Sequence, residues 1–170
     1  VDGTASTNII GGLVAGAGNE IAFNTTIGVL VGQSSSDNAV LGNAIHQNGT
    51  LGIDLIGNGI TPNDPGDIDE GANNLTNFPV LSATADGVQG TLNSIPNTTF
   101  RIEFFGNTAC DASGNGEGQI FLGSTSVTTD ATGNATIPLL ASAVDQFVTA
   151  TATDSSNNTS EFSTCVTPLG

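Results

Sequence analysis

The sequence predicts an all-β protein in which a short stack of parallel β-coils is joined to a β-sandwich. Three observations support this prediction. Residues 1–62 repeat at a spacing of 24 residues and are rich in Asn and Gly. Residues 79–170 alternate apolar and polar side chains in short runs that are separated by turn signals. Residues 63–78 between them are acidic and are expected to form a junction.

Composition limits the classes of partner. The chain has 170 residues, enough for one domain or two small ones. It carries 16 acidic residues against Arg101 and no Lys, which gives a net charge of −15. Such a field repels nucleic acid and anionic membranes and attracts cations, so we expect no nucleic-acid partner. No 18-residue apolar run is present, so we expect no membrane insertion. The mean hydropathy of +0.11 and the strand periodicity favour a folded chain over a disordered one.

The repeat aligns residues 19–31 with residues 43–55. Asn, Ile, Thr and Gly recur at matching places, and apolar residues match apolar ones. Residues 8–12 resemble residues 38–42 if residues 13–18 are an inserted loop. Short apolar triplets with Asn and Gly at the corners are typical of β-solenoid coils, whose corners need positive φ angles. A Gly/Asn-rich β-meander is the alternative. The matched positions are Asn19 with Asn43, Asn24 with Asn48, Ile27 with Leu51, Val29 with Ile53 and Val31 with Leu55.

Over residues 7–56 this pattern resembles the last coils of right-handed parallel β-helix proteins of the bacterial exported kind. The resemblance implies two to three coils, and fewer than about three such units are marginally stable alone. No amphipathic cap precedes the first coil, so its strand edges are expected to be exposed. We expect further coils or a neighbouring subunit to cover them. Because the chain begins with Val1 and not Met, we expect a removed leader or a fragment.

The alternation after residue 78 predicts seven strands and therefore an immunoglobulin-like β-sandwich. Phe100, Ile102 and Phe104 fall on one face of the clearest strand. Turns rich in Asp, Asn and Gly separate the runs. The expected strands are residues 79–85, 87–93, 99–105, 119–128, 135–139, 146–153 and 160–166.

Two segments, residues 75–139 (beginning LTNFPVLSATADGVQG) and residues 146–166 (QFVTATATDSSNNTSEFSTCV), resemble the immunoglobulin-like module that follows the β-helix in many large secreted bacterial surface proteins. This resemblance implies that Cys110 and Cys165 form a disulfide, which would stabilise the fold by roughly 4 kcal/mol on a chain-entropy estimate. Two cysteines with one His are too few for a zinc site, and in an exported chain a single disulfide is natural. Two buried free thiols are the alternative.

The junction holds Asp64, Asp67, Asp69 and Glu70 within seven residues. Carboxylates at such short spacing repel one another and are the hard oxygen ligands that calcium prefers. The stretch lacks the register of an EF-hand loop. The stretch is either a calcium site or a merely solvated acidic loop, and the sequence leaves both readings open.

A second and weaker cation site is the other candidate, formed by residues around the last hairpin and by Asp86 in the first turn of the predicted sandwich. Its acidic residues could equally be turn residues that accept local hydrogen bonds. The residues concerned are Asp86, Asp154, Asn157 and Glu161.

The sequence shows no catalytic constellation. Glu20 and Asp54 are the only carboxylates in the aligned repeats, and they occupy different repeat positions. Glycoside hydrolysis needs a pair of carboxylates. His46 has no adjacent Ser or Cys, and Arg101 lies in the predicted sandwich. We therefore do not expect an enzyme, and a polysaccharide-degrading β-helix is the least favoured reading.

The favoured function is a secreted, non-enzymatic structural protein, a subunit of a cell-surface layer or fibre that assembles head to tail as a homopolymer or with neighbouring subunits. The competing class is an adhesin or carbohydrate-binding module. The chain has eight Phe and no Trp or Tyr, so it has few aromatic side chains that could form a binding platform. Glycans are possible attachments at the Asn-x-Ser/Thr triplets, which begin at Asn24, Asn48, Asn74, Asn97, Asn134, Asn157 and Asn158.

Overall fold

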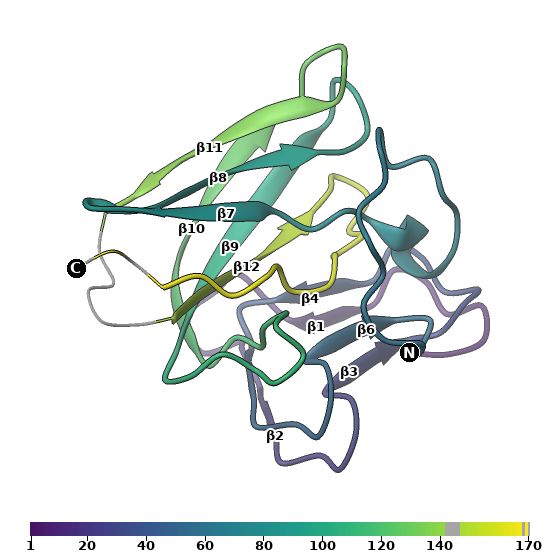
Figure 1. Cartoon of the computed structure of the whole chain (residues 1–170). Coiled ribbons are helices and arrows are strands. Elements are labelled where there is room, and N and C mark those ends of the chain that lie inside the picture. The colour runs from purple at the N-terminus through teal and green to yellow at the C-terminus, as the bar shows by residue number, and fades with distance from the viewer. Residues whose placement is uncertain (142–146, 168, 170) are drawn as a thin grey trace.

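A computed structural model describes residues 1–141, 147–167 and 169 of the chain. Their structure is all-β, as predicted, with one short 3-10 helix, η1 (Ala72–Leu75), and no α-helix among them. No helix in these residues is long and apolar enough to cross a membrane. Figure 1 shows the short N-terminal strands on one side and the longer strands on the other.

The first six strands are short and pair in parallel. They are β1 (Ile9–Gly11), β2 (Glu20–Ala22), β3 (Val29–Val31), β4 (Ala39–Leu41), β5 (Ala44–His46) and β6 (Ile53–Leu55). We call β1–β3 the first row and β4–β6 the second row. β1 pairs with β4, β2 with β5 and β3 with β6, so the second row stacks on the first.

The spacing of the sequence repeat equals the spacing of the residues that pair between the two rows. Glu20 pairs with Ala44 and Val29 with Ile53, each 24 residues apart. Ile9 pairs with Ala39, 30 residues apart, and the six extra residues equal the length of the expected inserted loop, residues 13–18. The alignments drawn from the sequence are therefore confirmed at all three strand pairs.

The corners differ from the expectation that Asn and Gly supply the positive φ angles. Gly42 does so with φ 63°, but Phe23 and Gln47 take φ 59° and 54°, directly before Asn24 and Asn48. Thr7 and Asp37 do the same one position before their Asn residues. The expectation was wrong for these Asn residues because their side chains are used to bond the next row, and the left-handed residue before each one turns the chain.

The longer strands form two antiparallel sheets of three strands. One sheet has the order β11–β8–β7, with β7 (Val80–Thr84), β8 (Gly87–Asn93) and β11 (Asn134–Leu140). The other has the order β10–β9–β12, with β9 (Thr99–Asn107), β10 (Ile120–Thr128) and β12 (Phe147–Thr153). Their apolar side chains share one core, which contains Leu92 and Ile137 from the first sheet and Phe100, Ile102 and Val148 from the second.

The expected strand at residues 160–166 forms only isolated bridges, so that prediction was wrong in detail. The hydroxyl groups of Ser160 and Ser163 accept the backbone N–H groups of Ala152 and Ala150 at 3.0 Å each. Side-chain oxygens thus take the place of carbonyls at these two positions, whereas Val148 keeps a backbone pair with Val166, and a regular ladder does not form. The strand expected at residues 146–153 begins outside the described residues, and its remainder is β12.

A second core joins the stack to the longer strands. It contains Val31, Val40 and Ile45 of the two rows together with Phe105 and Phe162. The two phenylalanine rings contact each other edge to face with centroids 5.4 Å apart. Phe105 belongs to β9, so the interior of the stack is closed by residues from the other side of the expected junction.

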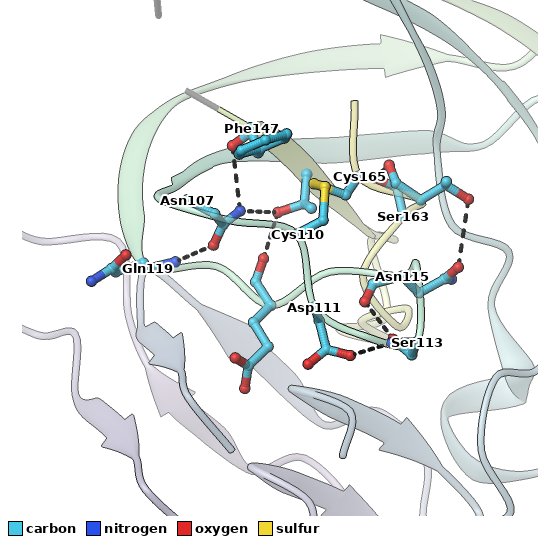
Figure 2. The surroundings of a disulfide bond; sticks show 12 residues. Asn107, Cys110, Asp111, Ser113, Asn115, Gln119, Phe147, Ser163 and Cys165 are labelled. Atoms are coloured by element: carbon cyan, nitrogen blue, oxygen red, sulfur yellow. Dashed lines mark hydrogen bonds between the residues drawn. A yellow bond between two sulfur atoms is a disulfide. The ribbon is translucent and has the colours of Figure 1, made fainter. Parts of the chain in front are cut away.

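Cys110 and Cys165 form a disulfide with their Cα atoms 5.8 Å apart (Figure 2), which confirms the expected pairing. The bond ties the loop between β9 and β10 to the segment after β12. Polar contacts hold the same loop, since the backbone N–H of Ser113 donates to Asp111 and the amide of Asn115 donates to the carbonyl of Phe162 at 3.1 Å.

Replacing both cysteines, as Cys110→Ser with Cys165→Ser, is expected to lower the free energy of unfolding by about 4 kcal/mol, because the bond closes a long loop of the unfolded chain. Equilibrium denaturation in urea measures this change. The wild-type chain in a reducing agent should show the same loss, and the variant should not respond to the reductant. A loss below about 1 kcal/mol would contradict the chain-entropy reasoning.

Candidate metal centre

Three carboxylates of the junction lie together. One side-chain oxygen from each of Asp64, Asp67 and Asp69 can be chosen so that all three lie within 4.8 Å of one another. Glu70, which the sequence grouped with them, is exposed and stands outside this set. The chain therefore gathers three of the four expected ligands.

Asn77 fixes the loop that carries these carboxylates. Its Oδ1 accepts the backbone N–H of Asp64 at 3.0 Å, and its Nδ2 donates to the carbonyl of Asp64 at 2.7 Å. Its own backbone N–H donates to Oδ1 of Asp67 at 3.1 Å. Farther along, Oδ1 of Asn93 at the end of β8 accepts the N–H of Gly66 at 2.8 Å. The junction is thus bonded to the first sheet.

Asp67 is the most enclosed of the three, with 9% of its surface exposed. Burial raises the pKa of Asp67 to about 6, against the opposing effect of hydrogen bonds from the Ser94 hydroxyl and the Asn77 N–H. The charges of Asp64 and Asp69 raise it further. The pKa of Asp69 is also raised, by its own burial and by the charge of Asp64.

Two oxygens at this site lack a hydrogen-bond partner. Oδ1 of Asp64 and Oδ1 of Asp69 are both buried and unpaired. A buried carboxylate oxygen without a donor destabilises the fold, and neighbouring carboxylates add repulsion. A bound cation would remove both costs. The arrangement could therefore hold a metal ion, and its all-oxygen donor set is of the kind that hard divalent cations take.

The second cation site considered from the sequence does not assemble among the described residues. The Asp154 carboxylate accepts the backbone N–H groups of Ser156 and Asn158, each at 2.8 Å, as a turn residue does. Glu161 lies elsewhere and contacts β6. The alternative reading, local turn hydrogen bonds, describes this hairpin.

Sequence reasoning missed the role of three buried glutamates, Glu103, Glu117 and Glu161. Each accepts one backbone N–H of the second row or its corner. The pairs are Gly42 with Oε2 of Glu103 at 2.8 Å, Asn48 with Oε1 of Glu117 at 2.9 Å, and Leu55 with Oε1 of Glu161 at 2.9 Å. Glu103 also receives Nε of Arg101, the only basic side chain of Lys or Arg type, at 2.9 Å.

The residues around each glutamate in the sequence do not predict these contacts. Glu103 looks like the polar member of an alternating strand, and Glu117 lies in a Gly-rich loop. Only the folded chain brings them to the second row. At Glu161, burial raises the pKa of the carboxyl to about 7, although N–H groups of Leu55 and Thr61 donate to it.

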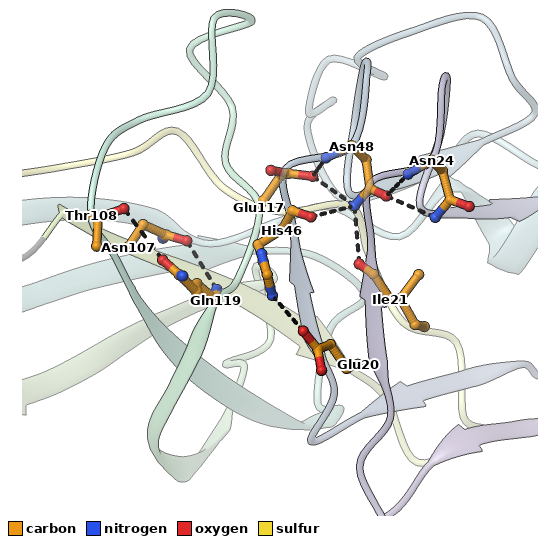
Figure 3. Close-up of polar contacts among 9 residues, drawn as sticks. All are labelled: Glu20, Ile21, Asn24, His46, Asn48, Asn107, Thr108, Glu117 and Gln119. Atoms are coloured by element: carbon orange, nitrogen blue, oxygen red, sulfur yellow. Dashed lines mark hydrogen bonds and ion pairs between the residues drawn. The ribbon is translucent and has the colours of Figure 1, made fainter.

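A polar cavity of about 260 Å³ lies between the second row and the loop that carries Cys110. His46, Asn107, Glu117 and Gln119 line part of it (Figure 3). Nδ1 of His46 is buried without a partner, and its Nε2 lies 3.6 Å from the carboxylate of Glu20.

No family model matches the chain, and no curated protein matches it either.

The stability of the fold is expected to fall as the pH rises from about 4 to about 7. The pKa values of Glu161 and Asp67 are higher in the folded chain, about 7 and about 6, than in the unfolded one. The folded state therefore holds protons that the unfolded state releases in this window, so raising the pH favours unfolding. Thermal melts in a calcium-free buffer at several pH values measure the slope.

Glu161→Gln should remove much of the dependence of stability on pH, because the substitution removes the titrating carboxyl group. Exposed Glu70→Gln is the matched control and should leave it unchanged. A stability that is flat or rising between pH 5 and pH 7 in the wild-type chain would contradict the protonated state of Glu161.

Proposed function

We propose that this chain is a non-enzymatic, extracellular structural protein, a subunit of a cell-surface layer or fibre. We further propose that the two rows are coils of a short right-handed parallel β-helix and that the antiparallel sheets form an immunoglobulin-like sandwich. The parallel registers, the shared core of the two sheets and the disulfide support this reading. The disulfide fits an oxidising, extracellular setting.

One observation carries the proposal, namely that the two ends of the stack are unequal. Val40 and Ile45 point into the second row and are 4% and 1% exposed. Ile10 and Ile21, their partners in the first row, are only half-buried. The edges of β1 and β2 on this side pair with no described strand. We call the first-row side of the stack the open end.

An open end of this kind attracts another chain, because unpaired strand edges and uncovered aliphatic side chains both favour strand addition. A neighbouring subunit that covers it makes a contact between unlike surfaces, and such contacts propagate into layers or fibres instead of closing into dimers. The function follows from this surface and not from a reaction centre.

Two proline substitutions test the proposal in native surface material. The backbone N–H groups of Ala39 and Ala44 donate to the carbonyls of Asn8 and Asn19 at 2.8 Å each. In a parallel ladder Ile9 and Glu20 therefore point their own N–H groups away from the second row. Ile9→Pro with Glu20→Pro removes these outward donors and leaves the internal bonds in place.

We expect negative-stain microscopy with an antibody against the chain to place the wild-type protein in a regular layer or fibre. The proline variant should be secreted and folded, as judged by circular dichroism, but lost from the assembly. A wild-type chain found only as free monomer, with β1 and β2 ordered, would contradict the proposal.

We also propose that Asp64, Asp67 and Asp69 bind calcium, which would hold the junction to the sandwich. Calcium at 100 times its dissociation constant should raise the free energy of unfolding by about 2.7 kcal/mol. Asp69→Asn should abolish this gain, and in chelator it should raise the melting temperature because one repelling charge is gone. Exposed Asp86→Asn is the control and should keep the calcium response. Melting curves of the wild type that coincide in calcium and in chelator would contradict this site.

A further inference from the structure

The junction contains the only Asp-Pro peptide bond of the chain, between Asp64 and Pro65. The carboxylate of an Asp residue can attack the carbonyl carbon of the same residue, because this closes a five-membered ring and expels the next nitrogen. A proline nitrogen carries two carbon substituents and leaves as a secondary amine. It also has no N–H, so it cannot attack the side chain in the competing ring closure. The reaction at this bond is therefore directed toward cleavage of the backbone.

The carbonyl oxygen of Asp64 receives two N–H donors. Nδ2 of Asn77 lies 2.7 Å from it, and the backbone nitrogen of Asp67 lies 3.3 Å from it. Attack on the carbonyl carbon places negative charge on this oxygen, and donors that already point at the oxygen stabilise that charge without rearrangement. The two donors therefore have the arrangement of an oxyanion hole.

The carboxylate of Asp64 has one oxygen in use and one oxygen free. Oδ2 accepts the backbone N–H of Ile68 at 3.2 Å, whereas Oδ1 is buried and has no partner. Ile68 follows the peptide bond in question, so this hydrogen bond turns the carboxylate toward the part of the loop that contains the bond. A carboxylate oxygen that has neither water nor a donor around it is a stronger nucleophile than a hydrated one. Oδ1 of Asp64 is thus a candidate nucleophile.

The chain is anchored on both sides of the bond. Before it, the side-chain amide of Asn63 exchanges two hydrogen bonds with the backbone of Phe78, at 2.8 and 2.9 Å. After it, the backbone N–H of Gly66 donates to Oδ1 of Asn93 at 2.8 Å. Asn77 is 2% exposed and also donates to the carbonyl of Asn93 at 2.9 Å. The donors and the bond are therefore held in a fixed relative position, which favours an intramolecular reaction.

We propose that the folded chain cleaves its own Asp64–Pro65 bond. Oδ1 of Asp64 forms a bond with the carbonyl carbon, the bond from this carbon to the nitrogen of Pro65 breaks, and Asp64 becomes a cyclic anhydride. One water molecule supplies the proton that the nitrogen of Pro65 takes and the hydroxyl group that opens the anhydride. Pro65 is exposed, so water reaches the leaving nitrogen. The net reaction is hydrolysis of one peptide bond and needs no other reactant.

This activity goes beyond the proposed structural function and does not depend on it. It is a single reaction of the chain on itself and not the turnover of a substrate. The products are residues 1–64, which carry both rows, and residues 65–170, which carry both antiparallel sheets and the disulfide. The core that contains Phe105 and Phe162 and the bonds of the three buried glutamates still join the two products. They should separate only when the protein is denatured.

Mass measurement under denaturing conditions tests the proposal on the purified full chain. The chain is incubated for several days at neutral pH and physiological temperature, in a chelator so that no cation holds the carboxylate of Asp64. We expect fragments 1–64 and 65–170, whose summed mass exceeds the mass of the chain by one water. The same chain in guanidinium chloride has lost both donors and should cleave about 100-fold more slowly or less.

Three variants separate the parts of the reaction, and circular dichroism checks that each one is folded. Asp64→Asn keeps an acceptor for the N–H of Ile68 but removes the carboxylate, and it should stop the cleavage. Pro65→Ala keeps the carboxylate but replaces the leaving group, and it should also stop the cleavage. Asn77→Asp keeps Oδ1 but removes the Nδ2 donor, and it should slow the cleavage by about 100-fold. Asp86→Asn changes an exposed carboxylate outside the junction and should cleave at the wild-type rate.

The proposal is overturned if the folded wild-type chain yields no fragments, or yields them no faster than the chain in guanidinium chloride. It is also overturned if the Asp64→Asn chain cleaves at the wild-type rate, because the carboxylate would then not be the nucleophile. Should Asn77→Asp fail to fold, the comparison of the folded and denatured wild-type chains still tests the need for the donors. None of these results bears on the structural function, which depends on microscopy of the surface material.

Discussion

The structure depends on how the second row of parallel strands has its outward N–H groups satisfied. Three of those groups are accepted by the buried side chains of Glu103, Glu117 and Glu161, which come from β9, from the loop after it and from the segment after β12. Burying a carboxylate is costly unless hydrogen bonds or charges compensate it. The stack and the two antiparallel sheets therefore cannot be separated without exposing apolar residues and leaving both sets of polar groups unpaired.

This dependence explains how far the sequence could predict the fold. The register of β2 with β5 and of β3 with β6 was readable because stacked residues lie at a constant spacing, and similar residues recur at that spacing. The two antiparallel sheets could be predicted from the alternation of apolar and polar residues. Residues 160–166 were misread, because alternation does not reveal that Ser160 and Ser163 bond β12 through their hydroxyl groups.

The candidate metal site was predictable for a similar reason. Asp64, Asp67 and Asp69 are close in sequence, so proximity needed only a tight loop, and Gly66 and Asp67 supply it with positive φ angles. Glu70 lies just beyond and faces solvent. The glutamates that close the stack could not be identified, because each meets a partner more than sixty residues away, as Glu103 meets Gly42.

The two sides of the stack differ in how their backbone N–H groups are satisfied. On the second-row side, Glu103, Glu117 and Glu161 accept the N–H groups of Gly42, Asn48 and Leu55. A further parallel row on that side would need the same N–H groups for its own pairing. A longer stack of such rows would therefore end at β4–β6, because the chain itself has already used the bonds that another row would make there.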